Sequence, residues 1–144
     1  MSDTYSAQDY QAGRIPGQAE SRHAKRRRER ERQMQERLKA WRDSFPDEHP
    51  VRMLRAIPNH RTAGGRVGEP LQVAGTPDLL LAVSGTWRGL KYNTLWLELK
   101  VPPNCPSEKQ EKEMERLGRW GNASAVCYSV EETKKAVLRY LGLD

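Results

Sequence analysis

The residues whose types and spacing best suit chemistry are two charged side chains near the middle of the chain. Glu98 and Lys100 lie two positions apart, at the end of an apolar stretch that begins at Leu95. Because successive side chains of a β-strand point to opposite faces, a strand here places the carboxylate and the amine on one face. An isolated Glu-x-Lys pair is also a common surface ion pair, so it does not identify a site by itself.

A third charged residue, Asp78, precedes this pair in the sequence Gly-Thr-Pro-Asp. An aspartate after a proline is often only a turn residue. Here the stretch 77–83 is apolar enough for a buried strand, and a hairpin between it and a strand over 94–101 would bring Asp78 beside Glu98. The sequence therefore predicts a cluster of three charged groups at one end of this hairpin.

Such a cluster suits the hydrolysis of phosphodiester bonds. Two carboxylates offer the hard oxygen ligands that Mg²⁺ or Mn²⁺ prefers, and such a cation neutralises developing charge and acidifies an attacking water. We therefore expect Asp78 and Glu98 to bind the metal, with the backbone carbonyl of Leu99 as a further ligand. Lys100 could orient or deprotonate the water, or stabilise the pentavalent phosphorus.

The elements that must position these residues follow from apolar periodicity and from the prolines and glycines that interrupt it. Good helix formers run from about residue 22 to 44 and predict a first helix. Its apolar stripe comprises Met34, Leu38, Trp41 and Phe45. Further strands are predicted over 51–57, 77–83, 94–101 and 123–128, and helices over 107–120 and 130–141. The order α-β-β-β-α-β-α indicates an α/β fold with a mixed sheet flanked by helices.

Length and composition bound the organisation of the chain. With 144 residues it is long enough for one domain, predicted over 21–144, after a disordered tail over 1–20. No apolar run could span a membrane and the first residues lack the features of a signal peptide, so a cytoplasmic location is expected. The cysteines and histidines are too scattered for structural zinc. No glycine-rich phosphate loop is present, so no nucleotide cofactor is expected.

The net charge of +6 is concentrated in one segment. Residues 22–42 contain ten Lys or Arg against three Glu, so this segment carries +7 and the rest of the chain is close to neutral. Cationic surfaces gain affinity for polyanions by releasing condensed counterions, which favours a nucleic-acid partner. A solvated, merely solubilising helix face is the alternative.

Several motifs together give the chain a resemblance to the VRR-NUC (virus-type replication-repair nuclease) family of the PD-(D/E)xK nuclease superfamily. Over about residues 29–142 the matching segments are Ile57-Pro58-Asn59, Gly75-Thr76-Pro77-Asp78-Leu79, Glu98-Leu99-Lys100, Pro106-Ser107-Glu108-Lys109-Gln110 and Ala125-Val126-Cys127-Tyr128. The resemblance implies a restriction-endonuclease-like core over about 51–142, DNA as the substrate, and Mg²⁺ or Mn²⁺ as the cofactor. The single-domain format looks like the free-standing members found in bacteriophages, which are expected to form homodimers.

The resemblance also implies a role for a glutamate on the first helix. Glu31 matches the family's position and would be a further metal ligand. Its spacing to Met34 and Leu38 places it on the apolar stripe rather than on the solvated side of the helix. It could instead be a surface partner of Arg27 or Gln35.

A glutamine near the catalytic lysine of the family matches Gln110. We expect Gln110 to support the site without binding the metal directly. Because Ser107-x-x-Gln110 is also a capping box, in which the glutamine serves the start of a helix, the two roles can coexist.

Six residues are candidates for contacts with the nucleic acid. They are Arg27, Arg28, Asn59, His60, Arg61 and Arg66. The last four lie in or beside a glycine-rich loop over 60–75, where a flexible connector with scattered charges is the equal alternative. The chain departs from the family here, since His60-Arg61 stand where glycines are more usual.

These observations favour a metal-dependent nuclease, and the resemblance suggests a structure-selective endonuclease in phage replication, recombination or repair. The second hypothesis is a non-catalytic nucleic-acid-binding module on the same fold. A basic scaffold protein, with Asp78 and Glu98 as ordinary surface charges, would require all the motif matches to be accidental.

Overall fold

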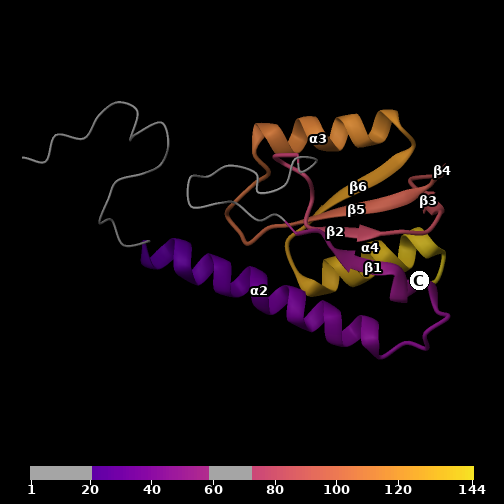
Figure 1. The fold of residues 1–144 in the computed structure, drawn as a ribbon, viewed down its shortest axis with the longest axis horizontal. Helices are drawn as coiled ribbons and strands as arrows, with labels where there is room; N and C mark the ends of the chain where they lie inside the picture. Colours follow the sequence, from indigo (N-terminus) through magenta and orange to yellow (C-terminus); the bar gives the residue numbers. More distant parts are fainter. Residues whose placement is uncertain (1–20, 59–72) are drawn as a thin grey trace, which may run out of the picture.

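The computed structural model describes residues 21–58 and 73–144 (Figure 1). Its elements are α2 (Arg22–Asp43), the 3₁₀ helix η1 (Pro50–Met53), β1 (Leu54–Ala56), β2 (Leu79–Leu81), β3 (Gly85–Trp87), β4 (Leu90–Tyr92), β5 (Thr94–Leu99), α3 (Glu108–Arg119), β6 (Asn122–Cys127) and α4 (Val130–Leu141). The main sheet has the strand order β1-β2-β5-β6. Its first three strands are antiparallel and β5 and β6 are parallel, which confirms the predicted mixed sheet. The predicted tail, 1–20, lies outside the described residues.

Helices cover both faces of this sheet. Figure 1 shows α3 on one face and α2 and α4 on the other. On β5, Leu95, Leu97 and Leu99 are buried in a core that includes Leu38 of α2 and Val137 of α4. Because side chains alternate along a strand, Glu98 of β5 and Lys100, which directly follows the strand, point to the α3 face.

The first helix is predicted correctly. It begins after Ser21, whose side chain accepts a hydrogen bond of 3.1 Å from the backbone N–H of Ala24. Leu38 is buried, and the other members of the predicted stripe pack against the core. No helix in the ranges 21–58 and 73–144 has the length and apolar content to cross a membrane.

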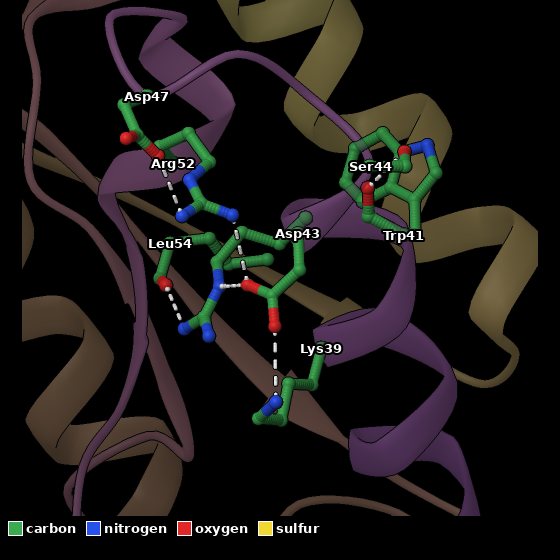
Figure 2. A network of polar contacts seen from close by, with 8 residues as sticks. Lys39, Trp41, Asp43, Ser44, Asp47, Arg52 and Leu54 are labelled. Carbon is green, nitrogen blue, oxygen red and sulfur yellow. Dashed lines mark hydrogen bonds and ion pairs between the residues drawn. The ribbon is translucent and has the colours of Figure 1, made fainter.

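A network of polar contacts fixes the end of α2 to the segment that follows it (Figure 2). Asp43 accepts hydrogen bonds from Lys39 at 2.9 Å, Arg42 at 2.8 Å and Arg52 of η1 at 3.1 Å. Arg42 also donates to the carbonyl of Leu54, at the start of the edge strand β1 (3.1 Å). The bonds from Arg42 and Lys39 hold the pKa of Asp43 down at about 2. Asp43 therefore links α2, η1 and the edge of the sheet.

The predicted strand over 51–57 is wrong in its first half. Residues Pro50–Met53 form η1, and only Leu54–Ala56 join the sheet as β1. Pro50 has a φ suited to the first position of a helix, and the His49 ring accepts a hydrogen bond of 3.2 Å from the N–H of Val51. This local cap outweighs the apolar pattern that suggested a longer strand.

Residues 84–93, predicted as a turn, contain the additional hairpin β3–β4. Its two-residue loop is Arg88-Gly89, with φ angles of +50° and +81°. Two positive φ values give a loop whose twist matches that of the paired strands. The predicted pairing of the flanking strands holds, since β2 and β5 are antiparallel neighbours.

The hairpin is tied to α4 by one buried hydroxyl, which generates a prediction for stability. The Tyr140 hydroxyl lies 2.8 Å from the carbonyl of Val83 and 3.2 Å from that of Tyr92, and the residue is 1% exposed. Tyr140→Phe leaves these carbonyls without their donor and is expected to lower the free energy of unfolding by about 1–2 kcal/mol. Urea denaturation measures this. Tyr128→Phe, at an exposed ring, is the matched control, and equal losses in both variants would contradict the assignment.

Candidate active site

The candidate site lies where β2 begins and β5 ends. The register pairs Leu79 of β2 with Leu97 of β5. Continuing this antiparallel register by one residue places Asp78 directly opposite Glu98, so their side chains share the α3 face of the sheet. The structure thus brings together the two carboxylates that the sequence separates by twenty positions.

Pro77 shapes this end of the sheet because it cannot donate a hydrogen bond. The same register places it opposite Leu99, where the ladder would otherwise continue. The N–H of Leu99 instead donates to Oδ2 of Asp78 at 2.8 Å. In a strand the N–H and C=O of one residue point to the same neighbouring strand. The carbonyl of Leu99 is therefore also directed to the side of β5 on which Asp78 and Pro77 lie. The N–H of Leu99 therefore fixes the Asp78 carboxylate. Pro77, which has no N–H, leaves the Leu99 carbonyl without a ladder donor.

Glu98 is the most buried ionisable side chain of the site, with 2% exposure. Its Oε1 accepts from Nζ of Lys100 at 3.0 Å and from Nε2 of Gln110 at 2.5 Å. Its Oε2 is buried and, among the residues that the structure describes, has no hydrogen-bond partner. A buried carboxylate oxygen without a donor requires either a proton or a cation.

Gln110 serves the helix and the site at the same time. Its Oε1 accepts from the N–H of Ser107 at 2.8 Å, and its own N–H donates to Oγ of Ser107 at 3.2 Å, which completes the predicted capping box. The remaining Nε2 donates to Glu98. The cap fixes which end of the amide faces Glu98, so the start of α3 holds the donor in place.

Gly75 is a positioning residue, a role that the sequence pattern did not predict. Its φ is +87°, and a Cβ built on it would lie 2.6 Å from the carbonyl oxygen of Lys109 and 2.9 Å from the backbone nitrogen of Gln110. Only glycine allows the chain before Asp78 to approach the first turn of α3 so closely. In the sequence, the only indication of this role is that Gly75 lies three residues before Asp78, in a loop with other glycines.

Burial raises the pKa values of both carboxyls, and like charge adds to the shift at Glu98. For Glu98, burial and the nearby Asp78 raise the pKa to about 7, against the opposing effect of Lys100. Burial also raises the pKa of Asp78, although the N–H of Leu99 and the charge of Lys100 oppose the shift. Each carboxyl therefore favours a proton, or another positive charge, more strongly than an exposed one does.

Glu31 lies at the margin of this cluster. It is half-buried on α2, and its pKa is raised by burial and by the charge of Asp78. Lys100, Arg27 and Arg28 act in the opposite direction. Within 21–58 and 73–144, no three His, Cys, Asp or Glu side chains are grouped closely enough to hold a metal ion. The structure thus places Glu31 within electrostatic range of the site but outside a three-carboxylate cluster.

The remaining predicted residues are more distant or are not described. Arg27 and Arg28 lie on the exposed N-terminal half of α2, on the side of Glu31. The four candidates in and beside the glycine-rich loop lie outside the described residues; they are Asn59, His60, Arg61 and Arg66.

The fold that carries this cluster is similar to that of a solved structure. No family model and no curated protein matches the sequence. A solved structure described as a VRR_NUC domain protein aligns with 77% of this chain and 87% of its own, with a TM-score of 0.63 and 17% sequence identity. The predicted restriction-endonuclease-like core, and the resemblance at the level of the fold, are therefore confirmed.

The close approach at Gly75 predicts a specific loss of stability. Gly75→Ala combines a strained positive φ with a clash against helix backbone, and we expect the free energy of unfolding to fall by about 1–3 kcal/mol. Gly118→Ala, inside α3 and with open space around its Cβ, is the control and should stabilise the protein by roughly 0.5–1 kcal/mol. Urea denaturation separates the two. Equal effects of the two variants would rule out the proposed packing at Gly75.

The raised pKa of Glu98 predicts how stability depends on pH in the metal-free protein. Between pH 4.5 and about 7, Glu98 ionises in the unfolded chain but stays protonated in the folded one. Its contribution to stability is therefore complete below pH 4.5 and is lost as the pH rises to about 7. Unfolding in EDTA should show Glu98→Gln gaining stability relative to the wild type across this range. A Glu98→Gln difference that stays constant across this pH range would refute the shift.

Proposed function

We propose that this protein is a divalent-metal-dependent nuclease that hydrolyses DNA phosphodiester bonds at Asp78, Glu98 and Lys100. The observation that carries the proposal is the state of Glu98. One of its oxygens is held by Lys100 and Gln110, the other is buried without a donor in the described chain, and a second carboxylate lies opposite. The fold similarity to a VRR_NUC domain protein supports the same function.

The donor set fits Mg²⁺ or Mn²⁺. Magnesium is commonly bound through one or two carboxylates while it keeps several waters, so a third carboxylate is not required. Asp78 and Glu98 would hold the ion, with the carbonyl of Leu99, and Glu31 would act on it from a greater distance. When bound, such an ion supplies charge neutralisation at the phosphate and acidifies an attacking water.

The other side chains of the site have distinct roles in this proposal. Lys100 is 16% exposed and anchored on Glu98, so its ammonium is held in place to orient the water or to stabilise charge on the phosphate. Gln110 keeps the Glu98 carboxylate in one orientation. Gly75 is a positioning residue, because it allows α3 to approach the site closely enough for that contact.

The proposal extends to partners and to the kind of substrate. The ten basic residues of segment 22–42 suit a nucleic acid. We propose a structure-selective endonuclease that acts in phage replication, recombination or repair. We also propose a homodimer, which would set two such sites against two strands.

Cleavage assays test the proposal. Labelled duplex, single-stranded and four-way-junction DNA are incubated with Mg²⁺, Mn²⁺ or EDTA. We expect cutting that requires the metal and that falls by a factor on the order of 10² or more in Asp78→Asn and Lys100→Met, because each variant removes a charge that contacts the reacting centre.

The exposed carboxylate variant Glu48→Gln is the matched control and should cut like the wild type. Circular dichroism and urea denaturation establish that each variant is folded. If folded wild-type protein binds DNA but cuts none of the three substrates with either metal, the nuclease proposal is rejected. A non-catalytic binding module would then explain the basic helix.

A further inference from the structure

The basic residues of α2 include two groups that differ in their contacts. On one side of the helix, Arg32 forms ion pairs with Glu29 at 2.7 Å and with Glu36 at 2.6 Å, and Lys39 forms one with Asp43 at 2.9 Å. These pairs largely neutralise that side. They are structural contacts within the helix and do not leave a free cationic surface.

The second group is His23, Arg26 and Arg30. Their spacing of three and four residues places them on one side of α2. All three are exposed, and none makes an ion pair with any residue in the part of the chain that the structure describes. This side of the helix therefore carries positive charge that no described acidic side chain neutralises by an ion pair.

These three side chains, together with Arg27, line a cleft of about 380 Å³. Its opposite wall is the turn Val101-Pro102-Pro103-Asn104, which follows β5. No acidic side chain lines the cleft. Three guanidinium groups and an imidazole around a concave surface without carboxylates create a positive potential that attracts an anion.

The cleft continues along the helix. Arg30 and Val101 also line an adjoining cleft of about 270 Å³, which is bordered by the exposed ring of Tyr128. Arg37, at the far end, is paired with Glu131 at 3.7 Å, so the excess positive charge ends there. We call the two clefts together the α2 groove. Its combination of guanidinium groups and an exposed aromatic ring matches what single nucleic-acid strands contact in proteins.

The α2 groove begins beside the candidate active site. Val101 directly follows Lys100 in the chain. Arg27 lines the groove, and its charge acts on Glu31, which in turn is affected by Asp78 and Lys100. A chain of phosphates lying in the groove would therefore pass the end of β5, next to Lys100 in the sequence and within electrostatic range of Glu31.

We propose that the α2 groove binds the phosphate backbone of the nucleic-acid strand that enters the active site, without reading its sequence. From His23 to Arg30 the helix rises roughly 10 Å at about 1.5 Å per residue. That length corresponds to about three nucleotides of a stacked strand. Arginine contacts to phosphate position a strand but carry no base information. The inference rests on the proposed function only in taking the bound strand to be the one that is cut.

Binding measured without cleavage tests the groove. Fluorescence anisotropy with labelled single-stranded and duplex DNA of about 20 nucleotides, in EDTA, gives Kd as a function of salt concentration. Arg26→Ala/Arg30→Ala is expected to raise Kd by about tenfold or more at low salt. It should also reduce the slope of log K against log salt by roughly 1.5–2, since about two phosphate contacts are lost.

The control is Arg32→Ala/Lys39→Ala, which removes the same charge from the paired side of the same helix and should change Kd by less than roughly threefold. Arg26→Lys/Arg30→Lys keeps the charge and should retain most of the affinity. Alanine favours helix, so circular dichroism should show α2 intact in every variant.

If both alanine pairs weaken DNA binding equally, DNA binds to the diffuse charge of the helix. If binding is unchanged in Arg26→Ala/Arg30→Ala, the strand lies elsewhere. Either result overturns the groove. A protein that binds through the groove but cuts no DNA would reject the nuclease function alone. If the protein is a metal-dependent nuclease but its Kd for DNA is unchanged in Arg26→Ala/Arg30→Ala, only the groove proposal is rejected.

Discussion

The burial of Glu98 is the constraint on which the rest of the site depends. A carboxylate that has lost its water needs compensating charge or hydrogen bonds, and Lys100 and Gln110 supply them to only one of its oxygens. The charge of Asp78, directly before the neighbouring strand β2, increases the need for compensating positive charge and raises the pKa of Glu98 further. The folded chain thus keeps a carboxylate oxygen that a proton can satisfy at low pH and a cation can satisfy at neutral pH. The energetic cost of burial is what would make this position selective for a positive charge.

The local backbone provides the geometry that this arrangement requires. Pro77 has no N–H with which to continue the ladder, and the N–H of Leu99 donates to the Asp78 carboxylate. Gly75 then allows the preceding chain to contact the first turn of α3. The same turn holds Gln110 by its capping box and directs its amide to Glu98. The site therefore combines the two carboxylates with two backbone features, the end of the ladder at Pro77 and the close approach at Gly75. Each feature depends on a residue with unusual conformational properties.

The sequence predicted those features that depend on periodicity. The alternation of β5 and the apolar stripe of α2 each bury one side of an element, so the pattern is visible over many residues. The hairpin β3–β4 and the helix η1 were not predicted, because strands of three residues and a single 3₁₀ turn are too short to show a period. The role of Gly75 was not predicted either, since it depends on the backbone of Lys109, which is distant in sequence. Which arginines of α2 are paired likewise depends on side-chain geometry, which composition does not reveal.

The two halves of α2 differ: the C-terminal half packs against the core, and the N-terminal half carries exposed basic side chains. Its C-terminal half buries Leu38 and is held by the Asp43 network, whereas the residues of its N-terminal half are nearly all exposed. Helix formation is cooperative, so an anchored half can propagate helix into a segment that has few tertiary contacts. Arg26 and Arg30 are like charges one turn apart, which destabilises that segment. A polyanion that neutralises them would relieve this repulsion, so binding in the α2 groove and the order of the helix that forms it are thermodynamically coupled.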